Sequence, residues 1–415
     1  MIKFNSLLVF GGAILFAFIA GRVAKRLRVP LVIGYVLMGV ILGKSFLNIF
    51  NPDLVNRMEI VNDLALGIIA FIIGGELNFS RLKRLGRAIF SIAISESLGA
   101  FILVSLSTYF FTKDVKISLL LGAVASATAP AATVSVINQY RTKGILTTTI
   151  LGVVAIDDGI ALIIYIFVAG FVSSFLTLSH LHFAKLIFLS LGKILLSLGL
   201  GLILGIIISY LGRKVREKKT FFSLTLGVFL LGEGLAISLG LSELLLIMSM
   251  AMMMSNLSPH RFVSIMDYFE VVGFPIIAGF FCLAGTRLNI NLFTQIGFLA
   301  IVYLFARFLG KYLGASLGAS LSKAPAVVRR YIGLTLWPQI GVALALAIMV
   351  ERNFGSLKGG EYLASLAINV LLFTTIITET VGPLATKYAL NKAGEIRKFR
   401  FKQKGGEDGA FNNYS

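Results

Sequence analysis

Long apolar segments, separated by short charged or turn-rich breaks, run through the whole chain. Most are close to the length of about 20 residues that an α-helix needs to cross a bilayer. We therefore predict an all-α polytopic membrane protein with about 13 transmembrane helices. The expected helices cover residues 5–21, 30–46, 60–79, 88–111, 117–138, 145–173, 186–211, 221–239, 241–256, 264–285, 295–321, 329–350 and 362–387.

Composition and charge support this prediction. Of the 415 residues, 57% are hydrophobic and only 14% are charged, which excludes an ordinary soluble domain. The net charge of +19 comes from basic clusters in every second break rather than from a patch that could bind nucleic acid. This alternation predicts an external N-terminus and a cytoplasmic C-terminus in the cell (inner) membrane. Basic residues after Leu7–Ala20 favour an uncleaved first helix over a signal peptide.

A weak internal repeat suggests how the helices are organised. The third expected helix ends in Phe71–Asn78 and the tenth in Phe281–Asn289, two similar sequences at opposite ends of the membrane. Inverted repeats are an architecture of secondary transporters. We expect a membrane transporter domain over 1–387, followed by a short basic and polar cytoplasmic tail, 388–415, at the lipid surface. Its parts are repeat one (1–176), a linker helix (186–211) and repeat two (221–387).

Two adjacent aspartates, Asp157 and Asp158, are the most informative polar residues. They lie in the middle of the otherwise uncharged segment Ile145–Leu176. One carboxylate at the centre of a membrane helix costs roughly 2.5–3.5 kcal/mol, and two neighbours also repel each other when ionised. Because adjacent residues point about 100° apart on a helix, we expect one aspartate to bind a proton or cation while the other faces a neighbouring helix.

Two prolines predict broken helices near this pair. Pro130 interrupts a helix rich in small and hydroxyl residues, and Pro338 interrupts the repeat-equivalent helix. An unwound segment would expose carbonyls and hydroxyls, notably those of Ser126, Thr128 and Thr133, which suit a small cation. A tolerated kink is the alternative for each proline.

Charged residues on other helices are the candidate partners. Arg307 lies in mid-helix and is the expected partner of an aspartate, whereas Lys311 could extend toward the cytoplasmic surface. Glu96 and Glu379 are expected to pair with basic groups or to face a polar cavity.

Several other kinds of chemistry are not indicated. Gly310–Gly318 follows an apolar helix rather than a strand, which favours close helix packing over dinucleotide binding. The only cysteine, Cys282, cannot form an intrachain disulfide. The sequence shows no phosphate loop, zinc-protease motif or nucleophile elbow. We expect no cofactor and no enzymatic activity.

Several segments in this order resemble the monovalent cation:proton antiporter-2 family of the sodium/proton exchanger fold, in its Asp-Asp branch. The segments are Arg26–Gly34 with Gly39 and Gly43, Gly74–Asn78, Ser126–Pro130, Ala155–Asp158 and Phe281–Leu288. The resemblance implies a homodimer, in which each protomer has a core of helices 88–173 and 295–387 with two broken crossing helices.

The resemblance also implies roles for individual residues. Asp158 matches the ion-binding carboxylate, Asp157 the carboxylate paired with a basic residue of the eleventh helix, and Thr128 a cation contact in the broken helix. Lysine is common at the basic position, whereas Arg307 is expected to occupy it here; a shift of the alignment by one helical turn would place Lys311 there instead. Arginine effectively never releases its proton, so an electrogenic stoichiometry is in doubt.

The function expected from these features is exchange of Na⁺ (or Li⁺) for H⁺ by alternating access, with both ions competing for Asp158. A K⁺/H⁺ antiporter or K⁺ efflux system of the same fold is the first alternative. A Na⁺-coupled symporter of organic anions and a non-transporting ion sensor are the others.

Overall fold

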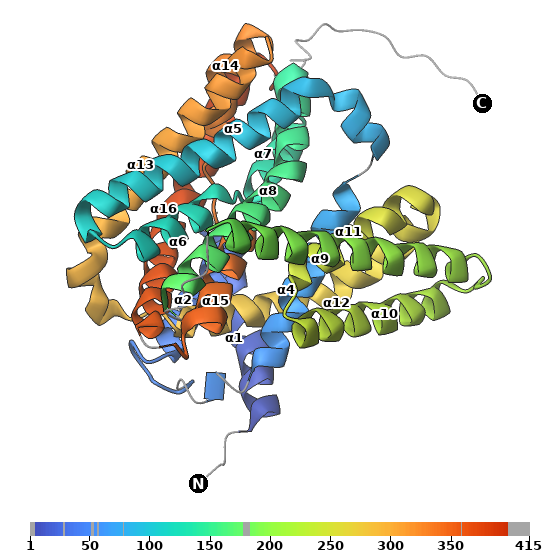
Figure 1. Cartoon of the computed structure of the whole chain (residues 1–415), viewed down its shortest axis with the longest axis horizontal. Helices are drawn as coiled ribbons and strands as arrows, with labels where there is room; N and C mark the ends of the chain where they lie inside the picture. The colour runs from blue at the N-terminus through green and yellow to red at the C-terminus, as the bar shows by residue number, and fades with distance from the viewer. Residues whose placement is uncertain are drawn as a thin grey trace, which may run out of the picture.

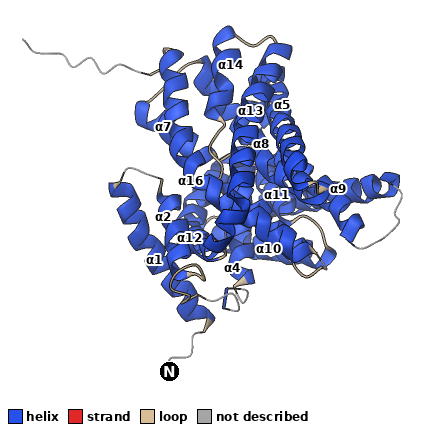
Figure 2. Cartoon of the chain, turned by 90° about the vertical axis from the view of Figure 1, so that its left-hand side faces the viewer, coloured by secondary structure: helices blue, strands red, loops and turns tan. Residues whose placement is uncertain are grey.

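The computed structural model describes residues 5–27, 30–50, 54–55, 58–77, 79–176, 183–357 and 359–396. Within these residues the chain forms 15 α-helices and two 3₁₀-helices, joined by short loops and without strands (Figure 2). The elements are α1 (Ser6–Arg26), α2 (Leu31–Leu42), α4 (Glu59–Glu76), α5 (Phe79–Thr112), α6 (Val115–Ser126), α7 (Pro130–Tyr140), α8 (Ile145–Leu176), α9 (Phe183–Gly212), α10 (Lys218–Leu239), α11 (Glu243–Leu257), α12 (Pro259–Thr286), η1 (Ile290–Leu292), α13 (Phe293–Leu321), α14 (Ala326–Tyr331), η2 (Ile332–Thr335), α15 (Gly341–Phe354) and α16 (Gly360–Lys392).

The all-helical membrane fold is confirmed, and each of the thirteen expected helices has a counterpart. Eight described helices are long and apolar enough to cross a bilayer. Their outer surfaces carry large apolar side chains such as Leu195, Phe274 and Leu384, as expected for contact with lipid. Two ends differ from the expectation. The helix α5 begins at Phe79 and bends at Gly86, whose φ of 70° permits the kink, and α16 continues past 387 to Lys392. The remaining tail residues, 397–415, lie outside the described part of the chain.

The two broken helices are confirmed. The first separates α6 from α7 at residues 127–129, and the second separates η2 from α15 at residues 336–340. The breaks touch each other, because the Ala129 N–H donates to the Pro338 carbonyl at 2.9 Å. The Thr133 hydroxyl adds a second link to the Thr335 carbonyl at 2.8 Å.

Small residues bring α5 and α13 into close contact, as the Gly310–Gly318 segment predicts. A Cβ atom at Gly310 would lie 2.7 Å from the Ala100 Cα, and one at Gly314 would lie 2.3 Å from the Ser95 carbonyl oxygen. The two helices run side by side in Figure 1 because only glycine allows this backbone approach.

The helices form two neighbouring groups. One contains α5–α8 and α13–α16, and the other contains α1, α2, α4 and α9–α12 (Figure 1). Loops end on two faces. If each helix or broken helix crosses the bundle once, the breaks 141–144, 213–217 and 322–325 fall on one face, here called the basic face, and 43–50, 240–242, 287–289 and 355–357 fall on the opposite face.

Candidate functional site

Asp157 and Asp158 lie in the interior of the first helix group. Both residues are 0% exposed, and none of their four carboxylate oxygens has a hydrogen-bond partner of good geometry among the described residues. The helix α8 positions them by packing between α5 and α6, so both side chains are enclosed by protein rather than lipid. A buried carboxylate without a donor is strongly unfavourable when ionised. The pair therefore favours an arriving positive charge, either a proton or a cation.

The first helix break lies beside the pair. The helix α6 ends at Ser126, the backbone is extended at Ala127, and Pro130 occupies the first turn of α7. This break leaves carbonyl groups without helical partners. Thr128, within the break, lies next to both aspartates.

Lys311 of α13 extends into this break. Its ammonium donates to the Ser126 carbonyl at 2.5 Å and to the Thr128 hydroxyl at 2.8 Å. The same ammonium forms an ion pair with Glu96 of α5 at 2.5 Å, and both side chains are 0% exposed. The Ser97 hydroxyl donates to the other oxygen of Glu96 at 2.8 Å. The expectation that Lys311 could extend toward the cytoplasmic surface is therefore wrong, because its side chain is buried at the centre of the site.

Arg307 has a different partner from the expected one. Its guanidinium donates to four carbonyls at the crossing of the two breaks, those of Ala125, Ala127, Trp337 and Pro338, at 2.6–3.3 Å. Asp157 accepts no hydrogen bond from it. The expected Asp157–Arg307 pair is thus replaced by contacts to backbone, because one planar fork satisfies the free carbonyls of both breaks at once.

Glu379 of α16 supports the second break. Its carboxylate accepts the Gln339 backbone N–H at 2.8 Å, just before α15 begins. The Gln339 side chain donates to the Val124 carbonyl at 3.1 Å and to the Tyr303 hydroxyl at 2.5 Å. A negative group at the start of a helix is favoured by the helix dipole. Glu379 thus accepts a backbone N–H, which is neither the ion pair nor the polar cavity expected for it.

Four of the expected site residues come together as anticipated: Asp157, Asp158, Ser126 and Thr128. The Ser126 hydroxyl is directed to the Ala123 carbonyl, at 2.6 Å, so its backbone carbonyl is the group turned toward Lys311. The sequence pattern did not predict the pairing of Lys311 with Glu96. A signal for it exists, since Glu96 is three residues from Gly99 and Lys311 is three from Gly314, which places both on the glycine-lined contact of α5 and α13.

Sequence comparison identifies relatives of known class. Residues 14–391 match a family described as sodium/hydrogen exchanger, transmembrane. The chain is 23% identical over 401 residues to the Na(+)/H(+) antiporter NhaG of Bacillus atrophaeus, covering 90% of this chain and 73% of that protein. A 157-residue stretch is 26% identical to the probable Na(+)/H(+) antiporter GerT of Bacillus cereus, covering 38% of this chain and 41% of that one.

Comparison with solved structures shows that a sodium proton antiporter has a similar fold. The structure of the sodium proton antiporter MjNhaP1 from Methanocaldococcus jannaschii at pH 8 superimposes with a TM-score of 0.77 at 18% identity, over 93% of this chain and 98% of that one. A second structure of that antiporter, from electron microscopy, gives a TM-score of 0.73 at 20% identity, over 94% and 98% of the two chains.

Proposed function

The chain belongs to the sodium/hydrogen exchanger family, and from that premise we propose that it exchanges Na⁺ (or Li⁺) for H⁺ across the cell (inner) membrane. The observation that carries this proposal is the buried, unpartnered pair Asp157 and Asp158 beside a helix break. The Asp-Asp pair also supports membership of the antiporter-2 branch of the family.

Competition at Asp158 provides the coupling. A buried carboxylate can accept a proton or a partly dehydrated cation, but the two ligands neutralise the same charge and exclude each other. The break contributes the Thr128 hydroxyl and the Ser126 carbonyl as oxygen ligands, once Lys311 withdraws from them. Each crossing of the membrane therefore carries either a proton or a cation.

Lys311 changes the expected charge balance. Lysine, unlike arginine, can release its proton in a desolvated site. Lys311 already contacts the two break oxygens that a cation would need. We assign it the basic role first expected of Arg307, with Glu96 as its carboxylate partner and Asp157 as a second charge on the same network. This arrangement makes a stoichiometry above one proton per cation chemically accessible.

Alternating access would come from movement of the first helix group, α5–α8 and α13–α16, against the second. We propose that the second group forms a homodimer, that the basic face is cytoplasmic, and that the opposite face is external. The asymmetry of Lys and Arg between the faces supports this orientation, in which the N-terminus is external and the C-terminus cytoplasmic.

Reconstitution tests the proposal directly. Purified protein in proteoliposomes should collapse an imposed pH gradient when Na⁺ or Li⁺ is added, and the Asp158→Asn variant should not exceed empty liposomes. Asp267→Asn, the same change at an exposed position of α12, is the control and should retain exchange. Full exchange by Asp158→Asn would refute the site, and exchange with K⁺ but not Na⁺ would establish the K⁺/H⁺ alternative instead.

A further inference from the structure

A cavity of about 510 Å³ lies between the two helix groups. Its walls come from α8 and α15 of the first group and from α9, α10 and α11 of the second. The turn 240–242 forms part of the wall, which places the cavity at the opposite face. A volume of this size is typical of a ligand site.

The wall carries an available positive charge on α9. Lys193 is exposed, and its ammonium has no hydrogen bond or ion pair with a described residue. The other two charged residues of the wall, Glu243 and Arg352, pair with each other at 3.0 Å. A ligand with a negative group would therefore find its partner in Lys193.

Tyr165 of α8 supplies a second hydrogen-bond donor. Its side chain is 1% exposed and lines the cavity. The hydroxyl oxygen accepts from the Asn353 side-chain amide at 3.0 Å, whereas the hydroxyl hydrogen has no acceptor among the described residues. A buried donor without an acceptor is unfavourable, and a ligand oxygen would satisfy it. The two donors, one from each helix group, thus favour an anionic group with several acceptor oxygens.

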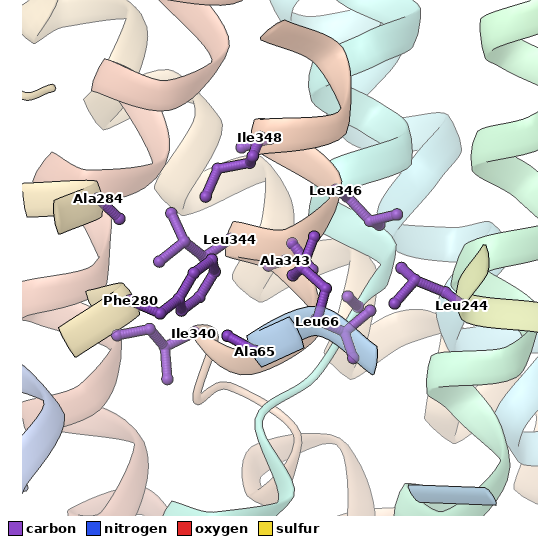
Figure 3. Packing of buried hydrophobic residues seen from close by; sticks show 14 of the residues in the cluster. Ala65, Leu66, Leu244, Phe280, Ala284, Ile340, Ala343, Leu344, Leu346 and Ile348 are labelled. Carbon is purple, nitrogen blue, oxygen red and sulfur yellow. The ribbon is translucent and has the colours of Figure 1, made fainter. Parts of the chain in front are cut away.

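Much of the remaining wall is apolar. It includes Met349, together with Leu189 and Ile237, whose side chains are 47% and 39% exposed. Ile237 belongs to a helix long and apolar enough to cross the bilayer, so an exposed side chain there can meet lipid. Next to the wall, Leu244 of α11 and Leu346 of α15 are buried and lie near each other (Figure 3). The surroundings therefore suit a ligand with an apolar part beside its anionic group.

The depth of Lys193 in the membrane indicates which amphiphile can reach it. Lys193 is 19 residues before Gly212, where α9 ends on the basic face. At 1.5 Å per residue this length is about 28 Å, close to the roughly 30 Å of the hydrocarbon core. The ammonium of Lys193 is thus near the level of the lipid headgroups at the opposite face, toward which a lysine side chain extends.

We propose that this cavity binds an anionic phospholipid of the leaflet at the opposite face. The lipid phosphate lies at Lys193 and Tyr165, and an acyl chain follows Leu189 and Ile237. A zwitterionic headgroup is disfavoured, because it brings its own cation to the ammonium of Lys193. The bound lipid contacts both helix groups, and its binding does not depend on the proposed antiport function.

Lipid-dependent thermal unfolding of the purified full chain in detergent tests the site. Phosphatidylglycerol should raise the melting temperature, because a ligand that binds only the folded protein stabilises it, and phosphatidylcholine should need roughly ten times the concentration. Lys193→Gln should raise the phosphatidylglycerol concentration for half of the effect about tenfold, since one charge-assisted hydrogen bond is lost. Lys113→Gln, the same change at an exposed lysine between α5 and α6 on the same face, is the control and should leave this concentration unchanged.

Tyr165→Phe provides the second variant, in which only the hydroxyl is removed. The phosphatidylglycerol concentration for half of the effect should rise about threefold, whatever the loss of the Asn353 contact does to the melting temperature without lipid. If Lys193→Gln cannot be purified, this variant decides alone, and a wild-type response would refute the site. Equal responses to the two lipids, or a wild-type response in Lys193→Gln, would likewise overturn it. Equal stabilisation by soluble glycerol phosphate would identify a free anion as the ligand and overturn the proposed lipid.

Discussion

The two broken helices share one architecture but differ in what their surroundings leave unpaired. At the second break, the Trp337 and Pro338 carbonyls accept from Arg307, and the Gln339 N–H is accepted by Glu379. At the first break the carbonyls are also satisfied, but the neighbouring helix α8 adds two carboxylates that no described group satisfies. Among the described residues, the second break keeps two unpaired buried atoms, the Trp337 Nε1 and the Gln339 Oε1, but no unpaired carboxylate, whereas the first break has two unpaired carboxylates beside it.

This difference supports placing the proposed ion site at the first break. A helix break alone supplies carbonyls and dipole ends, and the protein neutralises them with Arg307, Lys311 and Glu379. Ion binding needs further acceptors that these three side chains do not satisfy. Asp157 and Asp158 supply such acceptors beside the first break only, so under the proposed function one of the two breaks takes part in ion binding.

The largest effect is expected at Arg307, which serves both breaks at once. Replacing it by glutamine should leave up to four buried carbonyls without donors and reduce the free energy of unfolding by about 5 kcal/mol, the upper end for a buried charge. Thermal unfolding in detergent should show the largest fall of any variant discussed. Arg307→Lys keeps the charge but not the planar fork, and its melting temperature should lie between those of the wild type and Arg307→Gln. A normal melting temperature for Arg307→Gln would mean that the breaks do not depend on each other.

Lys311 and Glu96 should show a smaller and mutually dependent effect. Lys311→Met removes one partner of a buried pair, which costs roughly 3 kcal/mol because Glu96 remains buried and uncompensated. The double variant Lys311→Met/Glu96→Met removes both charges and should recover most of that loss. Melting temperatures of the two single variants and the double variant form a double-mutant cycle. Simple additivity would show that the pair is not coupled.

Replacing a carboxylate should have opposite effects on stability at the two breaks. Glu379→Gln weakens a charge-assisted hydrogen bond to Gln339 and should reduce the free energy of unfolding by about 1–2 kcal/mol, with exchange retained. Asp157→Asn removes an unpartnered buried carboxylate, so its melting temperature should stay equal or rise. The same variant should alter the number of charges moved per cycle, measured as the membrane-potential dependence of exchange. A destabilised Asp157→Asn would reveal a structural partner for Asp157.

Much of the fold is predictable because hydrophobic length and proline are local signals. Segment 145–173 became α8 with three further residues, and Pro130 and Pro338 both lie in or next to broken helices. The position of Asp157 and Asp158 within a membrane helix was equally predictable, because a charged residue in an apolar segment is recognised from that segment alone. The kink at Gly86 could not be read, because glycine is tolerated within helices and only the backbone reveals its φ of 70°.

The partners of the charges were the unpredictable part of the site. Arg307 and Lys311 are one turn apart on α13, and either could reach the first break. The choice depends on the rotation of α13 against α5, which close contacts at Gly310 and Gly314 determine. That rotation directs Lys311 to Glu96 and Arg307 to the carbonyls. Pairing between helices follows from packing of the whole bundle, and a periodic sequence pattern does not record it.

The smallest expected effect concerns Glu395, beyond the end of α16, which caps the helix that carries the aspartates. Its carboxylate accepts the backbone N–H groups of Leu146 and Thr147 at 2.7 and 2.8 Å, and the Thr147 hydroxyl at 2.7 Å. Gly144 precedes α8 and offers no side chain, so a distant residue supplies the cap. Glu395→Ala should cost about 1 kcal/mol, as for other helix caps, while Glu395→Gln should cost less because its amide oxygen still accepts. Thermal unfolding in detergent measures both variants. Exchange at saturating Na⁺ should stay near the wild-type rate, since α8 remains packed between α5 and α6; a large loss of exchange would indicate that this end of α8 moves during transport.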